Sequence, residues 1–231
     1  AVNNATFEVR SGEILAVAGV QGNGQTELVE ALTGLRLVDS GTVVLEKKPL
    51  HAGSPREIAM AGVAHIPEDR NRDGMVKGMT IAENYILNTY HLPQYSKNGL
   101  LNRKAIAAAT EQAVKDFDIR TPSISTDIAS LSGGNQQKVI VAREFSRNVR
   151  LVIAAQPTRG LDVGSIEYIH RRIVEQRDAG AAVLIVSTEL DEVLALGDRV
   201  AVMYEGRIVG ILDAKEATRE RVGLLMGGIT K

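Results

Sequence analysis

Continuous apolar runs alternate with amphipathic segments along most of the chain. Three runs contain only apolar residues over the length of a strand, at 14–18, 151–155 and 182–186. Uninterrupted runs of this length are typical of parallel strands that are buried on both faces. Apolar residues at helical spacing follow these runs or lie between them, so we expect helices after residue 26 and over 58–60, 81–90, 104–117, 135–145, 163–179 and 190–196.

Shorter strand patterns complete the expected sheet. They occur at 6–9, 43–45 and 62–66, and the pair 200–204 and 207–211 flanks a Glu205-Gly206 turn, as in a β-hairpin. Strands alternating with helices predict an α/β fold with a mostly parallel sheet covered on both faces, in which ligands bind beyond the carboxyl ends of the strands. The stretch 73–130 has no clear strand pattern, and we expect an inserted helical subdomain there.

Composition narrows the classes of function. Of the 231 residues, 44% are hydrophobic, which is enough for a sizeable core. A net charge of −1 with both signs interspersed argues against a nucleic-acid partner. The absence of cysteine excludes disulfides and fits a cytosolic protein. The sequence shows neither a signal-peptide pattern nor an apolar run close to the roughly 18 residues of a membrane span.

A serine and two glycines precede the helix expected from Asn135. Ser132 suits an N-cap because its hydroxyl can accept from backbone N–H groups two or three residues on. Gly133 and Gly134 leave room for the close approach of a bulky group. A capped helix start of this kind favours an anion, and an ordinary helix start is the alternative.

A glycine-rich segment joins the first apolar run to the first expected helix. Backbone N–H groups in such a segment can surround phosphate oxygens, and phosphate loops also need a Lys for the phosphates and a hydroxyl for Mg²⁺. Thr26 supplies the hydroxyl, whereas Gln25 occupies the Lys position. A tight strand–helix turn without a ligand is the alternative. We expect nucleotide binding by Gly19, Gly22, Asn23, Gly24, Gln25, Thr26 and Glu27.

The stretch Leu131-Ser132-Gly133-Gly134-Asn135-Gln136 resembles the signature motif of ATP-binding-cassette (ABC) ATPases, in its sugar and nucleoside importer form. Companion segments follow the order of that family: the phosphate loop, 65–70, 151–162 with the D-loop Gly160-Leu161-Asp162, and 186–189. The resemblance covers nearly the whole chain, from Phe7 to about Ile211. It implies ATP and Mg²⁺ as ligands, and it implies a P-loop NTPase fold of the ABC type. That fold has an antiparallel β subdomain and an inserted helical subdomain, here a core over about 1–72 and 131–231 and a helical part over about 73–130.

Several working positions of the family carry other residues in this chain. The resemblance aligns Gln25 with a Lys, Ala155 and Gln156 with an Asp and a Glu, Thr188 with a phosphate-sensing His, and Glu68 with a Gln. Removing one preorganised donor typically costs about 10²–10³ in rate, and losing a positioned base about 10²–10⁴. With degenerate catalytic positions at Gln156, Thr188 and Glu68, we expect this domain's own site to hydrolyse ATP poorly or not at all.

In the family alignment, Ala155 removes a carboxylate near Mg²⁺, while Glu68 adds one where a neutral amide is usual. Glu68 and Thr26 are therefore our candidate Mg²⁺ ligands. The hypothesis predicts a lower Mg²⁺-ATP affinity in Glu68→Gln, and an unchanged affinity contradicts it. The alternative is a loop carboxylate paired with Arg70 or Arg72, since polar loops commonly carry such charges.

The resemblance is closest to the second cassette of a tandem subunit that energises sugar or nucleoside import, and Gly-Asn-Gly-Gln and Ala-Ala-Gln-Pro look more like the nucleoside branch. It implies a companion cassette upstream in the same polypeptide, transmembrane permease subunits and, indirectly, a solute-binding protein, at the cytoplasmic face of the plasma membrane. A start at Ala1 inside a strand-like segment fits a piece of a longer chain. We expect the adenine-stacking aromatic residue of the family to lie before Ala1.

Two other classes remain open. One is a soluble ABC protein of translation or DNA repair, although the expected insertion has no sustained heptads and no basic linker is seen. The other is a pseudo-ATPase that binds no nucleotide and serves only as a signature-bearing partner. Nucleotide titration separates this second class from an importer cassette.

Overall fold

The computed structural model describes residues 1–50 and 53–229, which form two compact units. Unit 1 contains Ala1–His65, Val149–Pro157 and His170–Lys231, and unit 2 contains Ile66–Asn148 and Thr158–Ile169. The subdomain limits implied by the family resemblance stay a prediction. In the described part of the chain, no helix is long and apolar enough to cross a membrane.

Unit 1 is built on a six-stranded sheet with the strand order β10-β9-β1-β8-β7-β4. The apolar runs form its centre, where β1 pairs in parallel with β8 and β9, and β7 pairs in parallel with β8. An antiparallel hairpin of β9 and β10 closes one edge. The strands are β1 Ile14–Ala18, β4 Val63–Ile66, β7 Leu151–Ala155, β8 Ala182–Ser187, β9 Arg199–Tyr204 and β10 Arg207–Asp213. The expectation of a mostly parallel sheet is confirmed.

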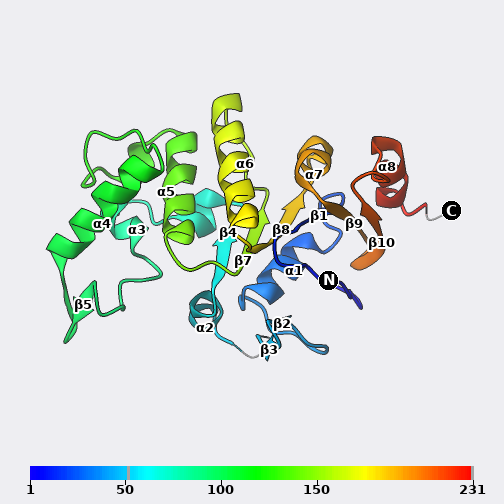
Figure 1. Cartoon of the computed structure of the whole chain (residues 1–231), viewed down its shortest axis with the longest axis horizontal. Helices are drawn as coiled ribbons and strands as arrows, with labels where there is room; N and C mark the ends of the chain where they lie inside the picture. The colour runs from blue at the N-terminus through cyan, green and yellow to red at the C-terminus, as the bar shows by residue number, and fades with distance from the viewer. Residues whose placement is uncertain (51–52, 230–231) are drawn as a thin grey trace. The chain divides into compact units, whose positions relative to one another are not determined.

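The core of unit 1 lies on both faces of this sheet. Every residue of β1 and β8 is buried, as expected for continuous apolar strands. Figure 1 shows α1 (Gln25–Leu32) and α7 (Leu190–Leu196) on opposite faces of the sheet. Leu28 and Val29 of α1 pack into the core against the strand side chains. The unit also contains α2 Pro55–Met60, the short strands β2 Val44–Leu45 and β3 Lys48–Pro49, the later turns of α6 (Val163–Asp178), and α8 Arg219–Met226. The hydrophobic pattern did not predict α8.

The strand expected at 6–9 is wrong. The segment makes no ladder hydrogen bonds, yet Phe7 and Val9 are partly buried and pack against the core of unit 1. The alternation of apolar and polar residues at 6–9 therefore reflects alternating burial and not strand pairing. Pairing needs a neighbouring strand edge as well, and the pattern holds no information on that.

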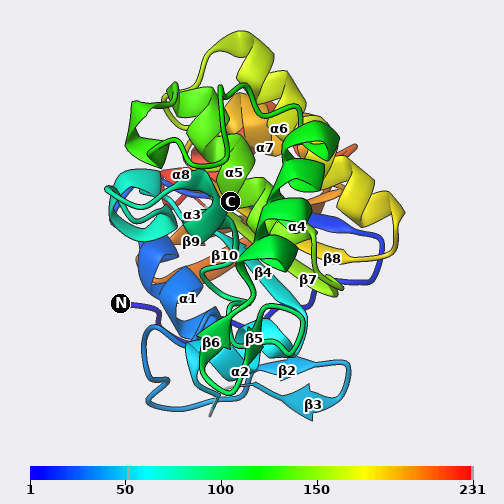
Figure 2. The ribbon, with the colours of Figure 1, turned by 90° about the vertical axis from the view of Figure 1, so that its left-hand side faces the viewer.

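Unit 2 is mainly helical. Its helices α3 (Ile81–Tyr85), α4 (Arg103–Asp116) and α5 (Gly133–Phe145) pack against one another, and Figures 1 and 2 show α4 beside α5. A π-helical turn η1 (Arg70–Gly74), a 3₁₀ turn η2 (Ile128–Ser130) and the start of α6 complete the unit. The expected helix at 81–90 ends at Tyr85, because residues 86–92 continue as successive tight turns.

The expectation that 73–130 contains no strand is also wrong. β5 (Ser96–Lys97) and β6 (Leu100–Leu101) form a short antiparallel hairpin. Asn98 and Gly99 connect the strands with φ values of 52° and 78°, the left-handed pair that a two-residue hairpin turn requires. The Asn-Gly pair was the available sequence signal.

Candidate nucleotide-binding site

The glycine-rich segment between β1 and α1 has the backbone of a phosphate loop. Gly22 and Gly24 have φ values of 92° and 103°, a backbone region that residues other than glycine rarely adopt. Gly24 is the N-cap of α1 and no side chain caps this helix. The first N–H groups of α1, with the positive end of the helix dipole, suit an anion at the carboxyl end of β1.

Gln25 closes back on the loop that precedes it. Its side chain is buried, and Nε2 donates a hydrogen bond of 3.0 Å to the carbonyl oxygen of Val20. A Cβ added to Gly19 would overlap Nε2, so the glycine at 19 makes room for this amide. A neutral amide at this position gives phosphate no charge-assisted hydrogen bond.

Asn23 ties the phosphate loop to the β9–β10 hairpin. Its Oδ1 accepts from the backbone N–H of Glu205 at 2.9 Å, and its carbonyl oxygen accepts from the N–H of Gly206 at 2.8 Å. Nucleotide binding by Asn23 stays a prediction; its side-chain oxygen accepts from the hairpin turn, and an amide nitrogen is the group that would donate to phosphate. Thr26 is exposed on the first turn of α1. A backbone hydrogen bond at the helix start lowers the pKa of Glu27.

The end of β7 carries an amide where the resemblance expects a carboxylate. The backbone N–H of Gln156 extends the pairing with β8 by donating to the carbonyl oxygen of Val186 at 2.8 Å. Its side-chain Nε2 donates to Thr188 Oγ1 at 3.1 Å, and its Oε1 accepts from the Thr188 N–H at 3.3 Å. Gln156 and Thr188, two of the expected catalytic positions, are thus brought together and bonded to each other.

In unit 2 the signature motif begins α5 as expected. Ser132 is the N-cap, and its Oγ accepts from the backbone N–H of Asn135 at 3.4 Å and from Asn135 Nδ2 at 2.9 Å. Two accepted bonds leave the hydroxyl proton of Ser132 available as a donor. Leu131 is the C-cap of the turn η2, and Gln136 is buried with its Nε2 donating to the carbonyl oxygen of Ile128 at 3.3 Å.

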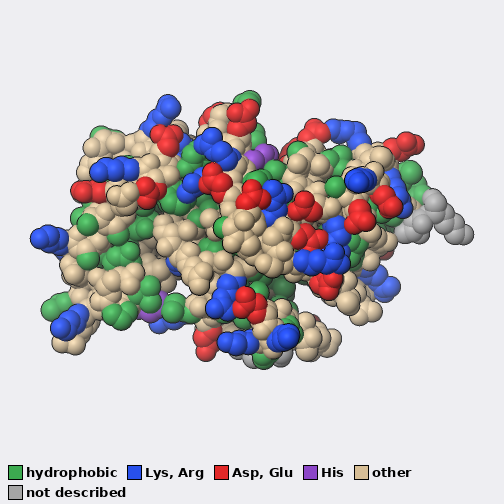
Figure 3. Space-filling model, viewed as in Figure 1, with side chains coloured by type: hydrophobic (Ala, Val, Ile, Leu, Met, Phe, Trp, Pro, Cys, Tyr) green, Lys and Arg blue, Asp and Glu red, His purple; other side chains and the backbone are tan. Residues whose placement is uncertain are grey.

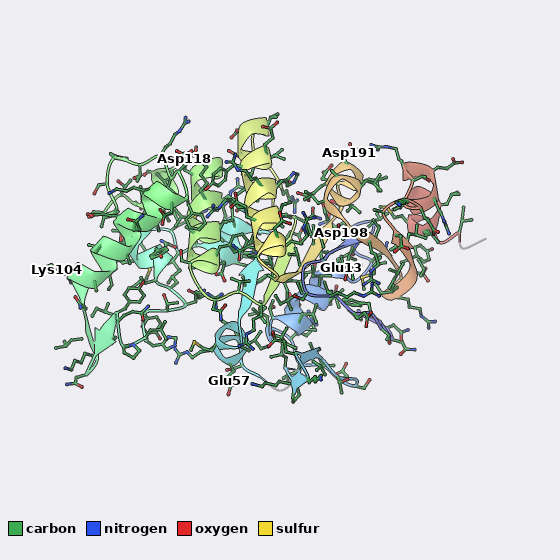
Figure 4. All side chains as sticks on the ribbon, viewed as in Figure 1. Glu13, Glu57, Lys104, Asp118, Asp191 and Asp198 are labelled. Atoms are coloured by element: carbon green, nitrogen blue, oxygen red, sulfur yellow. The ribbon has the colours of Figure 1, made fainter. Side chains whose placement is uncertain are left out.

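Contacts along α5 hold the signature helix in unit 2. Lys138 Nζ lies 2.7 Å from Asp118 Oδ2 and 4.4 Å from the centre of the Tyr168 ring. Figure 4 labels Asp118 near the end of α4. These contacts hold in place the turn of α5 that follows the signature motif.

The D-loop and the segment at Glu68 also belong to unit 2. Gly160 has a φ value of 68°, and Asp162 caps the start of α6, where Ser165 donates to it from Oγ at 2.8 Å and from its N–H at 3.0 Å. These bonds lower the pKa of the Asp162 carboxyl. Glu68 Oε1 accepts from Arg159 Nη1 at 2.8 Å, so Arg159 is an ion-pair partner of Glu68 that the alternative with Arg70 or Arg72 did not include.

The expected site residues thus fall into two sets. Unit 1 holds the phosphate loop at 19–27, Gln156 and Thr188; unit 2 holds Glu68, the signature at 131–136 and the D-loop at 160–162. Arg159 was not singled out in the sequence, because its contact with Glu68 joins segments 91 positions apart. No local pattern indicates such a pair.

The residues fit a Mg²⁺ ion only in part. Magnesium at a nucleotide is usually held by one or two protein oxygens together with phosphates and waters, and the exposed Thr26 hydroxyl can be one of them. Ala155 gives unit 1 no carboxylate at the end of β7. Among the described residues, no three His, Cys, Asp or Glu side chains form a metal-binding group.

A parallel sheet, a phosphate loop at the end of its central strand and a helix-capping Ser-Gly-Gly define the class of phosphate-loop nucleotide-binding domains. The family model "ABC transporter" matches residues 2–159. The chain therefore belongs to the ABC transporter family, of which it is an ATP-binding domain.

Curated relatives resemble the whole chain. It is 48% identical to the guanosine import ATP-binding protein NupO of Bacillus subtilis over 100% of its length, and 50% identical to the nucleoside import ATP-binding protein NupA of Lactococcus lactis over 98%. Identity to the glucose import ATP-binding protein TsgD13 of Haloferax volcanii is 41% over 99% of the chain. The chain spans 45%, 45% and 42% of these three proteins, which is less than half of each.

Solved ABC cassettes share the fold. The ATP-binding cassette MJ1267 superposes with a TM-score of 0.78 over 100% of this chain and 92% of its own, at 23% identity. The cassette MJ0796, in a dimeric post-hydrolysis state with ADP and Pi, superposes with a TM-score of 0.76 over 92% of this chain and 90% of its own, at 19% identity. The expected ABC-type P-loop fold is confirmed.

Proposed function

We propose that this chain is an ATP-binding cassette of a solute importer, with nucleosides favoured over sugars as the cargo. The support is graded similarity: the relatives named for nucleoside or guanosine import are 48–50% identical, and the relative named for glucose import is 41% identical. The cassette itself drives motion of membrane subunits and does not select the cargo.

We further propose that the domain contributes its signature motif to the ATP site of a companion cassette. The motif is intact from Leu131 to Gln136, and Ser132 retains a hydroxyl proton for a phosphate oxygen. The first N–H groups of α5 lie next to it and add the positive end of a 13-residue helix. These are the groups that a facing nucleotide needs, and none of them requires chemistry by this domain.

The observation that carries the proposal is the neutral end of β7. A water nucleophile needs a positioned base, and neither an amide nor a threonine hydroxyl can take up a proton near neutral pH. Gln156 and Thr188 hydrogen-bond each other instead, and Ala155 offers no oxygen to a metal. The domain's own site is therefore proposed to hold ATP while hydrolysing it weakly.

Thr26 is the ligand that this chain would offer to Mg²⁺, and the ion would neutralise phosphate charge when bound. Glu68 as a second ligand stays a prediction, because its Oε1 is engaged by Arg159 at 2.8 Å and metal binding competes with that ion pair. In this proposal Gln25 donates a neutral hydrogen bond to phosphate after it releases the carbonyl oxygen of Val20.

The partners follow from the proposed function. They are a companion cassette in the same longer polypeptide, supported by relatives about twice the length of this chain, and transmembrane permease subunits. A solute-binding protein acts with them indirectly. The proposed location is the cytoplasmic face of the plasma membrane.

The test is ATP turnover by the complete importer carrying Ser132→Ala. We expect turnover to fall about 10²-fold, the effect of removing one preorganised donor, because the facing γ-phosphate loses the serine hydroxyl. Ser125→Ala is the matched control, since Ser125 is an exposed serine of the same unit outside the motif. Equal turnover in the two variants would contradict the proposed role of the signature.

A further inference from the structure

We propose that Arg70 is a positioning residue that holds the signature motif and the D-loop segment in one fixed arrangement. The inference rests on the proposed use of the signature by a companion cassette, and it identifies the group that sets its geometry. Arg70 lies in η1, outside both motifs, and all contacts used here are within unit 2.

The Arg70 side chain binds the main chain of the D-loop segment. Its Nη1 donates to the carbonyl oxygen of Arg159 at 2.9 Å, one residue before Gly160. Glu68, two residues before Arg70, accepts a hydrogen bond from the Arg159 side chain at 2.8 Å. The stretch 68–70 thus holds both the backbone and the side chain of Arg159.

The other side of the Arg70 guanidinium lies against the signature. A Cβ placed on Gly133 would lie 2.7 Å from Arg70 Nη2, closer than real Cβ contacts allow, and 3.4 Å from Cζ. The guanidinium therefore occupies the space that the missing side chain leaves. This contact gives the glycine at 133 a role in packing within the chain, in addition to the approach of a phosphate.

The second signature glycine, Gly134, lies close to Ser165 and to Asp162 of the D-loop. A Cβ on Gly134 would overlap Ser165 Oγ and lie 3.4 Å from Asp162 Oδ2. Ser165 is held there by its hydrogen bonds to Asp162, the last residue of the D-loop. Both glycines therefore pack against groups that fix the position of the D-loop, with Arg70 spanning the gap between Gly133 and Arg159.

An arginine is required by this geometry. Its planar fork places Nη1 on the Arg159 carbonyl oxygen and Nη2 beside Gly133 at once, whereas the ammonium of a lysine is a compact point charge on a flexible stem. The neighbouring Glu68–Arg159 ion pair adds little to overall stability, since the Arg159 side chain is 60% exposed and exposed ion pairs contribute little. The rate is more sensitive than stability, because a misplacement of catalytic groups by about 1 Å can lower the rate on the order of 10²-fold.

The experiment is steady-state ATP turnover of the complete importer with Arg70→Lys, together with its unfolding midpoint. We expect kcat to fall about 10-fold or more with a change in KM for Mg²⁺-ATP of less than about 2-fold, because the signature acts in the transition state while nucleotide is held by the phosphate loop. The unfolding midpoint is expected to stay unchanged. Arg72→Lys, on the same turn with an exposed side chain paired to Asp73, is the control.

The outcomes separate this inference from the proposed function. An unchanged kcat in Arg70→Lys alongside a large loss in Ser132→Ala would overturn the role of Arg70 alone. No loss in either variant would overturn the proposed use of the signature as well. A fall in kcat matched by an equal loss of folded protein would assign Arg70 to general stability and overturn positioning.

Discussion

Single residues at the phosphate loop show how tightly this site is built. Gly19 directly follows the strand β1, and the Gln25 amide and the carbonyl oxygen of Met203 both lie where its side chain would be. The same loop is joined through Asn23 to the turn at Glu205 and Gly206. Small changes in these positions therefore act on the backbone that would hold phosphate.

Gly19→Ala tests this packing. The added Cβ would overlap the Gln25 amide, which can swing away, and would lie 2.8 Å from the Met203 carbonyl oxygen in β9, which cannot. We expect the free energy of unfolding to fall by about 1–3 kcal/mol, the usual cost of overpacking a core. Urea unfolding measures it, with Gly223→Ala as the control because a Cβ there meets nothing within 4 Å. Equal stability of the two variants would show that the loop can shift to admit a methyl group.

Residue-level prediction succeeded where the signal was local. Ser132 as an N-cap and the glycines of the phosphate loop follow from short-range chemistry. The hairpin contact of Asn23 and the contacts of Arg70 with Gly133 and Arg159 join positions far apart in the chain. One sequence does not encode such pairings in a form that periodicity or motif spacing can reveal.

Among the elements, α5 carries a buried charge network just beyond the signature. Glu144 has a side chain only 6% exposed, between Arg143 at 3.0 Å and Arg147 at 2.6 Å. Arg143 Nη1 also donates to the carbonyl oxygen of Gly74 in η1 at 2.9 Å. The network therefore links the signature helix to the turn that contains Arg70.

Glu144→Gln should weaken this element in a pH-dependent way. Burial alone would raise the Glu144 pKa, but the two guanidinium charges and their hydrogen bonds outweigh burial, and the net pKa lies below its ordinary value of 4.5. A lowered folded pKa gives stability that is present above 4.5 and is lost as the pH falls through the folded value. We expect a loss of about 3–5 kcal/mol at pH 7, because the substitution leaves buried guanidinium charge uncompensated.

The measurement is urea unfolding of both proteins at pH 7 and at pH values below 4.5. The difference in free energy should shrink toward the acid side, where the wild-type carboxyl takes up its proton. A difference that does not vary with pH would show that the cost comes from shape rather than charge. Glu175→Gln, whose side chain is 47% exposed in an ion pair on α6, is the control.

Elements were predicted well where burial sets a strong pattern. The apolar runs became β1, β7 and β8, because complete burial in a parallel sheet requires that composition. The segment 6–9 has the pattern of a strand without its pairing, and the β5–β6 hairpin was missed because it is too short to show alternation. Pairing depends on what lies alongside, which a local pattern does not contain.

At the scale of the whole molecule, the candidate site residues are divided between the two units. Unit 1 presents the phosphate loop with a neutral β7 end, and unit 2 presents an intact signature packed against its own D-loop. On the face seen in Figure 3, basic and acidic side chains are intermingled. The family and the fold could be predicted from motif order, whereas the division of the motifs between the units could not, because spacing along the chain does not give contacts.

The proposed function is tested most directly by phosphate release from the complete importer after the hydrolytic carboxylate expected in the proposed companion cassette is replaced by glutamine. The site in this chain is then the only unaltered one. Because Gln156 and Thr188 supply no base, we predict that turnover falls at least about 10²-fold, while ATP remains bound. Turnover at about half the rate of the unmodified importer would contradict the account, since it would show that this domain hydrolyses ATP as well as its companion.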